Sequence, residues 1–259
     1  AASAADKQAR DHLCAWLDRH GFEVVVDPVG NIFGILALRG GEGDAYFFCG
    51  SHLDSQPHGG RYDGTLGVAS ACYCALAIRQ AVEEGALLSA YSHIVVACWT
   101  GEEGARFQPS ILGSSTFCGA LQTADVLAIR DENGISLHEA LSEIGYQGNG
   151  RMPRPSRYAE LHIEQGPLLE RSGKAVGLVD RCWGATKLRI AVLGRPDHTG
   201  PTPMQDRRDA LLVAARIIAA VNDRVLASAA PAHGSVARMV VEPNSPNTVA
   251  ERVELWIEL

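Results

Sequence analysis

A histidine and two aspartates, His52, Asp54 and Asp63, lie close together in the sequence. They follow the apolar run 45–49, which has the length and aromatic content of a buried strand. Open α/β sheets place their chemistry at the carboxyl ends of strands, where these side chains would lie. Imidazole nitrogen and carboxylate oxygen are ligands that suit an ion of the Zn²⁺ or Mn²⁺ type. The first hypothesis is therefore a metal site, and its alternative is a polar loop in which Asp63 caps a helix.

A second acidic group, Glu102 and Glu103, follows the apolar run 92–99 and is flanked by glycines. The intervening segment 65–82 has apolar residues at helical spacing, so strand, helix and strand form a βαβ unit. The two loops are therefore expected at one rim of a parallel or mixed sheet. One carboxylate of such a pair can bind a metal while the other accepts a proton, because a nearby cation keeps the first ionised. Taken alone, the pair is also consistent with an exposed acidic turn.

His162 is a third candidate ligand. It lies in the segment 159–165, whose alternation predicts a strand that leads into Gly166 and Pro167. A single histidine on a strand is more often a hydrogen-bonded core residue, so that alternative stays open.

The elements that must position these residues form two groups. Ahead of 178, the pattern predicts helices over 4–20, 65–82, 109–119 and 136–144, strands over 22–26, 32–38, 45–49, 92–99 and 159–165, and a glycine-rich loop over 40–43. From 178 onward, it predicts strands over 186–193, 235–241 and 252–259 and a helix over 207–226. The order strand, helix, strand, strand is most of a small two-layer α+β domain of the ferredoxin-like kind. Because the sequence stops within a predicted strand, we expect both groups to be incomplete at the C-terminus.

The composition narrows the class of protein. With 46% hydrophobic and 20% charged residues, the chain has the balance of a soluble globular protein. A net charge of -7 without a basic cluster argues against a nucleic-acid or membrane-surface partner. No apolar run is expected to reach the roughly 20 residues that cross a bilayer. The 7 cysteines are irregularly spaced and mostly in apolar segments, which indicates reduced thiols in a cytoplasmic protein.

Five motifs, in family order over nearly the whole chain, resemble the hydantoinase/carbamoylase branch of the M20 metallopeptidase superfamily. They are GSHLDSQPHGGRYDGTLGV, TGEEGARFQPSILGSSTFCG, ELHIEQGPLLE, HTGPTPMQDRRDAL and PNSPNTV. The members that it resembles most are N-carbamoyl-L-amino-acid hydrolases, with allantoate amidohydrolase and β-ureidopropionase as cousins. The resemblance implies an α/β, mixed-sheet, di-metal catalytic domain over 1–177 and a smaller α+β lid and dimerisation domain over 178–259.

The resemblance also implies a set of metal ligands. His52 and His162 would hold one ion, and Asp63 would bridge to a second ion held by Glu103. Asp54 would orient a ligand imidazole from behind. Zn²⁺, Mn²⁺, Co²⁺ and Ni²⁺ all suit such ligands.

Four further residues receive roles in catalysis or substrate binding from the resemblance. Glu102 would be the general base that takes a proton from the attacking water, and Gln165 would line the substrate pocket. On the lid, His198 would stabilise the oxyanion and Asn247 would bind the substrate carboxylate.

The predicted reaction is hydrolysis of the ureido carbon–nitrogen bond of an N-carbamoyl-L-amino acid, which releases the amino acid, CO₂ and ammonia. A ureido carbonyl is a poor electrophile, so a Lewis acid and a strong nucleophile are both needed. We expect a small-molecule substrate and a homodimer formed through the lid. The alternatives are hydrolysis of allantoate or ureidoglycolate, a peptidase of the same superfamily, and a non-catalytic dimerisation or binding module.

The sequence also departs from the family pattern. The family has a further histidine for the second ion and an arginine for the substrate carboxylate, both beyond the point at which this sequence stops, at Leu259. The second metal site is therefore expected to lack one ligand in this chain. Gly101 stands where many members have Asn, and Thr199 where Ala is usual, and either could alter the pocket.

Overall fold

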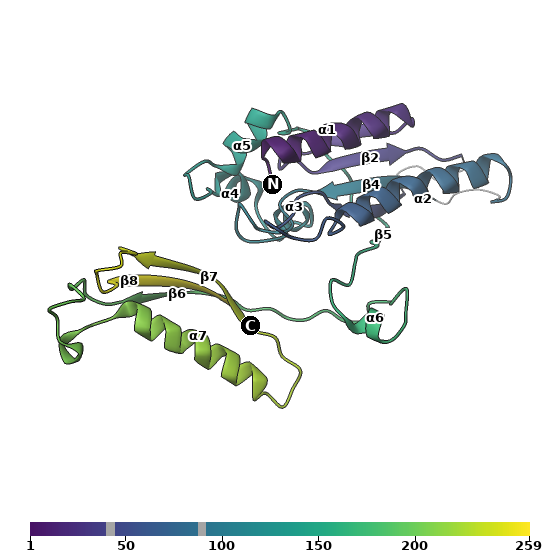
Figure 1. Cartoon of the computed structure of the whole chain (residues 1–259). Helices are drawn as coiled ribbons and strands as arrows, with labels where there is room; N and C mark the ends of the chain where they lie inside the picture. Colours follow the sequence, from purple (N-terminus) through teal and green to yellow (C-terminus); the bar gives the residue numbers. More distant parts are fainter. Residues whose placement is uncertain (40–44, 88–91) are drawn as a thin grey trace. The chain divides into compact units, whose positions relative to one another are not determined.

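The computed structural model describes residues 1–39, 45–87 and 92–259, and the chain divides into two compact units, Ala1–Val176 and Gly177–Leu259 (Figure 1). Each unit has its own hydrophobic core, so each is described by itself. The glycine-rich loop predicted over 40–43 lies outside the described residues.

The first unit is built on a mixed sheet with the strand order β1-β2-β4-β3-β5. In chain order its elements are α1 (Ala4–Arg19), β1 (Glu23–Val26), β2 (Ile32–Leu36), β3 (Tyr46–His52), α2 (Thr65–Glu83), β4 (His93–Trp99), α3 (Leu112–Phe117), α4 (Thr123–Ala128), α5 (Leu137–Ile144), β5 (Arg157–Ala159) and α6 (Leu168–Arg171). Strand β3 is parallel to β4 and β5, whereas β1, β2 and β4 pair antiparallel in succession. The predicted α/β class with a mixed sheet is confirmed.

The unit β3–α2–β4 positions the two acidic loops. In the parallel register of β3 and β4, His52 lies opposite Trp99, so both strands end at the same level. Strand β3 continues to His52, beyond the predicted run 45–49, and the loops that follow start at one edge of the sheet. Helix α2 begins after Gly64 without a side-chain cap, so Asp63 does not serve as the capping residue of the alternative interpretation.

Alternation along the strands gives this sheet two apolar faces. One face packs against α1 and α2, which run along the sheet in Figure 1, and it contains Ile32, Leu36, Ile94, Val96 and Cys98 with Leu13, Leu17, Ala71, Cys72 and Ala75 from the helices. The opposite face contains Phe33, Phe48, Val95, Ala97 and Trp99, with Phe117 of α3 packed on it. A slip of one residue would exchange the two faces, so their burial fixes the register.

Helix α2 corrects one expectation from composition. Its 19 residues and a hydropathy of 1.3 make it, within the described residues, a helix long and apolar enough to cross a membrane. In this structure Ala71, Cys72 and Ala75 of α2 are buried against the sheet. This packing is that of an amphipathic core helix.

The strand predicted over 159–165 is wrong in its position. Strand β5 is Arg157–Ala159, which pairs at the sheet edge with β3, and the chain leaves the ladder at Glu160. The carboxylate of Glu160 accepts hydrogen bonds from the hydroxyls of Ser51 and Tyr158, and these side-chain contacts hold the segment where ladder bonds end. Helix α4 was not predicted.

The second unit is a three-stranded antiparallel sheet with one long helix. Its elements are β6 (Lys187–Leu193), the 3-10 turn η1 (Met204–Asp206), α7 (Ala210–Leu226), β7 (Ser235–Glu242) and β8 (Arg252–Glu258), and the strand order is β6-β8-β7. Strand β8 lies between β6 and β7, which α7 connects, so this is the split βαβ arrangement of ferredoxin-like folds. Helix α7 starts later than the predicted 207 because the carboxylate of Asp209 caps it, accepting the amides of Leu211 and Leu212.

Candidate metal centre

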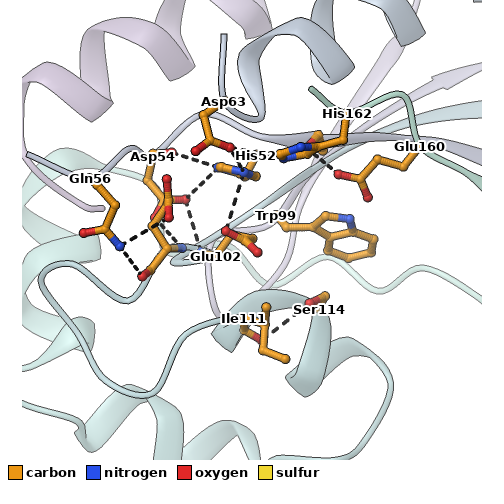
Figure 2. A network of polar contacts seen from close by, with 12 residues as sticks. His52, Asp54, Gln56, Asp63, Trp99, Glu102, Ile111, Ser114, Glu160 and His162 are labelled. Atoms are coloured by element: carbon orange, nitrogen blue, oxygen red, sulfur yellow. Dashed lines mark hydrogen bonds and ion pairs between the residues drawn. The ribbon is translucent and has the colours of Figure 1, made fainter. Parts of the chain in front are cut away.

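Three side chains from distant parts of the first unit converge on one point, as Figure 2 shows. Oδ1 of Asp63 lies 3.5 Å from Nε2 of His52 and 3.2 Å from Nε2 of His162. His52 ends strand β3, Asp63 precedes α2, and His162 follows β5. The His52 side chain is 1% exposed and that of His162 is 37% exposed, so the group opens to solvent on the His162 side.

Hydrogen bonds to backbone carbonyls fix the tautomer of both imidazoles. Nδ1 of His52 is 2.8 Å from the carbonyl oxygen of Asp54, and Nδ1 of His162 is 2.9 Å from that of Ile163. A carbonyl can only accept, so each Nδ1 carries a proton, and in the neutral ring each Nε2 presents a lone pair. Both lone pairs face a carboxylate oxygen of Asp63, which also carries lone pairs.

This donor set fits a divalent metal ion. Nε2 of His52 is buried and, among the described residues, has no hydrogen-bond partner. Lone pairs that face each other are stabilised by a cation between them. A ligating histidine commonly donates its other ring N–H to a carbonyl, as His52 and His162 do here. Two nitrogens and a carboxylate oxygen match the preferences of Zn²⁺ and of similar transition metals.

Asp54 contacts the imidazole of His52, the residue that it was predicted to orient, through its backbone carbonyl. Its carboxylate is farther away, with Oδ1 3.9 Å from Nδ1 of His52. The carboxylate accepts the backbone amides of Glu102 at 3.2 Å and of Glu103 at 3.3 Å. Asp54 therefore holds both the imidazole and the acidic loop, through different groups.

The Glu102 carboxylate lies beside the three converging side chains. Its Oε2 is 3.5 Å from Nε2 of His52. Burial raises the pKa of the Glu102 carboxyl, and nearby Asp54 and Asp63 raise it further, while His52 lowers it. A carboxylate with a raised pKa in this position is a suitable proton acceptor near neutral pH.

Glu103 lies on the Asp63 side of the group. Burial raises the pKa of the Glu103 carboxyl, and the neighbouring carboxyl of Asp63 raises it further. Its Oε1 is buried and lacks a hydrogen-bond partner among the described residues. Nε2 of Gln56 donates to the Glu103 carbonyl oxygen at 2.8 Å and to its Oε2 at 3.2 Å. Gln56 was not predicted as a site residue, because nothing in its spacing shows which loop it contacts.

A cavity of about 500 Å³ opens beside Glu102. Its wall includes Trp99, Ile111, Phe117, Tyr158 and Glu160. This volume is in the range of small-molecule sites. The aromatic and aliphatic wall would suit an apolar group carried by a small substrate.

The remaining predicted residue of the first unit, Gln165, lies against the metal-site loop. A Cβ placed on Gly60 would be 3.6 Å from Nε2 of Gln165 and 3.8 Å from Cβ of Asp63. The amide of Gln165 is therefore near the loop that carries Asp63.

His198 and Asn247 come together within the second unit. The backbone of His198 pairs with that of Thr248, and the amide of Thr199 donates to the carbonyl of Asn247 at 3.1 Å. The amide of Gly200 donates to Nδ1 of His198 at 3.0 Å. Nδ1 is thus an acceptor, so Nε2 of the neutral ring carries the proton and can donate a hydrogen bond.

Known proteins that are similar to this chain are amidohydrolases. Residues 31–137 match the sequence family described as Peptidase family M28, whereas the motifs had led us to expect the M20 superfamily. The chain is 37% identical to an N-carbamoyl-L-amino-acid amidohydrolase of Rhizobium meliloti, over 98% of this chain and 60% of the relative. It is 34% identical to the allantoate amidohydrolase of Bacillus subtilis, over 92% of this chain and 58% of the relative.

A solved structure matches the whole chain. The crystal structure of an amidase of the hydantoinase/carbamoylase family from Burkholderia vietnamiensis gives a TM-score of 0.91 at 36% identity, covering 100% of this chain and 62% of that one. The chain thus spans about 60% of the length of the relatives that it matches. Over this span, in sequence and in fold, it is similar to amidases of the hydantoinase/carbamoylase family.

Proposed function

We propose that this chain carries the metal site of an amidohydrolase that cleaves the ureido carbon–nitrogen bond of N-carbamoyl-L-amino acids. The observation that carries the proposal is the convergence of the Nε2 lone pairs of His52 and His162 on the carboxylate of Asp63. Names of similar proteins supply the substrate class, because relatives from several bacteria are N-carbamoyl-L-amino-acid amidohydrolases.

His52, Asp63 and His162 would hold one divalent ion, and Glu103, next to Asp63, would contribute to a second. Such an ion would supply Lewis acidity and would lower the pKa of water from 15.7 towards about 7. Zn²⁺, Mn²⁺, Co²⁺ and Ni²⁺ all remain candidates by ligand chemistry.

Glu102 would act as the general base. Its carboxylate would accept a proton from the water that attacks the ureido carbon and would pass a proton to the departing nitrogen. The products would be the amino acid and a carbamic acid, which breaks down to CO₂ and ammonia. The cavity beside Glu102 would receive the side chain of the amino acid.

The second unit would serve as a lid and as a dimerisation domain. His198, whose Nε2 carries a proton, would donate a hydrogen bond to the oxyanion, and Asn247 would bind the substrate carboxylate. Gln165, next to Gly60, would line the pocket. The exposed Leu211 and Leu212 of α7 are consistent with a homodimer formed through this unit, which size-exclusion chromatography with light scattering would detect. A cytoplasmic location stays a prediction.

Allantoate hydrolysis is the second candidate, favoured by the similarity to the allantoate amidohydrolase of Bacillus subtilis. Ammonia release would be measured with the purified, metal-loaded chain on N-carbamoyl-L-amino acids and, in parallel, on allantoate. Faster release from N-carbamoyl-L-amino acids supports the proposal, and faster release from allantoate favours the second candidate.

Elemental analysis separates both candidates from a non-catalytic binding module. Bound metal close to one or two ions per chain supports a hydrolytic site. A chain that holds no metal after exposure to Zn²⁺ and Mn²⁺ would be such a module.

A further inference from the structure

The acidic loop 100–103 is held from its buried side by a residue that the proposed mechanism does not use. Asn31 lies between the turn 27–30 and the first residue of β2, and it is 0% exposed. Its Oδ1 accepts the backbone amide of Thr100 at 2.9 Å. Its Nδ2 donates to the carbonyl of Gly113 at 3.1 Å and to Oδ2 of Asp27 at 2.7 Å. One buried amide thus connects the start of the acidic loop to helix α3.

Helix α3 itself binds the same loop through three successive backbone hydrogen bonds. The amides of Gly113, Leu112 and Ile111 donate to the carbonyls of Thr100 at 2.8 Å, Gly101 at 3.1 Å and Glu102 at 2.7 Å, respectively. Ile111 holds a left-handed backbone, with a φ of 56°, which is unfavourable for a β-branched residue.

The contact between Asn31 and Gly113 leaves no room for a side chain. A Cβ on Gly113 would lie 2.1 Å from Oδ1 of Asn31 and 2.6 Å from the amide nitrogen of Thr100. Close approach of the α3 backbone to both groups therefore requires glycine at 113. The three residues form a single packed unit under the loop.

Buried Arg10 of α1 supports this unit from the other side. It donates to the Gly30 carbonyl at 2.6 Å and to Oγ1 of Thr100 at 3.1 Å, and it forms an ion pair with Asp6 at 3.0 Å. Thr100 is thereby fixed through its backbone by Asn31 and through its side chain by Arg10.

We propose that Asn31 is a positioning residue for Glu102 and Glu103. By anchoring Thr100 to α3, it sets where the acidic loop leaves β4, while Asp54 holds the two glutamate amides from the site side. The chemical roles of Glu102 and Glu103 rest on the proposed function, but the anchoring does not. Because His52, Asp63 and His162 lie on other segments, Asn31 acts on only part of the site.

The anchoring is tested by amide hydrogen exchange, measured by NMR on the metal-free full chain. In the unsubstituted chain we expect the Thr100 amide to be protected. In Asn31→Ala we expect it to exchange roughly tenfold faster or more, because a buried donor has lost its acceptor. Val82→Ala, a core change at the far end of α2, is the control and should leave this amide protected. A Thr100 amide that exchanges like an exposed one in the unsubstituted chain, or that is unchanged in Asn31→Ala, overturns the proposal.

The positioning of Glu103 is tested by a double-mutant cycle with Zn²⁺ alone as the probe. Calorimetric titration would compare the unsubstituted chain, Asn31→Ala, Glu103→Gln and the double variant. If Asn31 acts through Glu103, Asn31→Ala weakens Zn²⁺ binding roughly tenfold when Glu103 is present. When Glu103 is already replaced by Gln, Asn31→Ala has little further effect. Equal effects in both backgrounds overturn the proposal.

A second variant, in α3, disturbs the same contact between Asn31, Thr100 and Gly113. Gly113→Ala leaves Asn31 intact but forces it away from Thr100, so both readouts should change in the same direction as in Asn31→Ala. If Gly113→Ala folds and leaves both readouts unchanged, the proposal is overturned. If the unsubstituted chain binds no Zn²⁺, the proposed function fails, and hydrogen exchange alone decides whether Asn31 anchors the loop.

Discussion

The backbone of Gly64 lies directly against the imidazole of His52. A Cβ built on Gly64 would be 2.5 Å from three ring carbons, Cγ, Cδ2 and Cε1. The glycine also holds a φ of 69°, in the left-handed region that other residues resist. The start of α2 is therefore packed on the ring that ends β3, and this contact helps to fix the direction of Nε2.

Gly64→Ala should displace the His52 ring and weaken metal binding, besides lowering the unfolding free energy by about 1–2 kcal/mol for the left-handed backbone. Gly85→Ala is the matched control, because Gly85 has a φ of 76° and a Cβ there would meet nothing within 4 Å. Thermal unfolding with and without Zn²⁺ separates the effects. We expect both variants to be less stable, but only Gly64→Ala to lose the Zn²⁺-dependent shift. An equal loss in both would contradict the packing argument.

His162→Ala should abolish most of the stabilisation that Zn²⁺ gives to the chain. A ligand present at 100 times its dissociation constant stabilises the folded state by about 2.7 kcal/mol, and loss of one of three ligands removes most of that gain. His138→Ala, at an exposed position of α5, is the control and should retain the gain. Melting curves recorded over a range of Zn²⁺ concentrations provide the measurement. A His162→Ala variant that is stabilised as strongly as the unsubstituted chain would show that His162 is not a ligand.

Glu102→Gln should keep the metal but lose turnover by about 10²–10⁴-fold, since the amide cannot accept the proton of the attacking water. Elemental analysis and ammonia release would be measured on the same sample. Glu143→Gln, at an exposed position of α5, controls for the change in net charge. Full activity in Glu102→Gln would refute its role as general base.

The buried thiols should make the fold sensitive to alkaline pH. Burial raises the pKa of the Cys98 thiol from 9.0 to about 12. Because the unfolded chain releases this proton near pH 9 and the folded chain only near 12, the stabilisation is complete below pH 9 and is lost as the pH rises towards 12. Urea unfolding between pH 8 and 10.5 should show this decline, and Cys98→Ala should make it shallower. An identical slope in Cys98→Ala would exclude this thiol as a source.

The exposure of the thiols gives a simpler test. Cys74, Cys118 and Cys182 are exposed, whereas Cys72 and Cys98 are buried. A thiol reagent should modify the exposed group within minutes on the native chain and the buried pair only after unfolding. Rapid modification of Cys98 in the native chain would contradict the described packing.

Residue types and spacing were sufficient to predict a mixed sheet and most helices and to single out His52, Asp63 and His162 as candidates. The family resemblance supplied their roles as ligands, which stay a prediction. Neither could predict which group of a residue makes each contact. Asp54 illustrates this, since its carbonyl meets the imidazole and its carboxylate meets the acidic loop. That choice depends on the path of the backbone after β3, which no local pattern encodes.

Contacts between residues far apart in the sequence were the other feature that the sequence pattern could not predict. Residues 159–165 alternate like a strand, but β5 ends at Ala159, because it pairs with β3 only over a short stretch and Glu160 then bonds to Ser51. The side-chain amide of Asn31 contacts Thr100 and Gly113, which lie far along the chain. Such partners are set by tertiary packing.

The parallel register that places His52 opposite Trp99 makes the length of β3 a determinant of the chemistry. One additional residue within that strand would carry the imidazole about 3.3 Å farther along and turn it to the opposite side of the sheet. Point changes in the apolar part of β3 could be absorbed by repacking, but an insertion or deletion there could not. Among natural variants that keep the metal site, length changes should therefore fall in the loops and spare this strand.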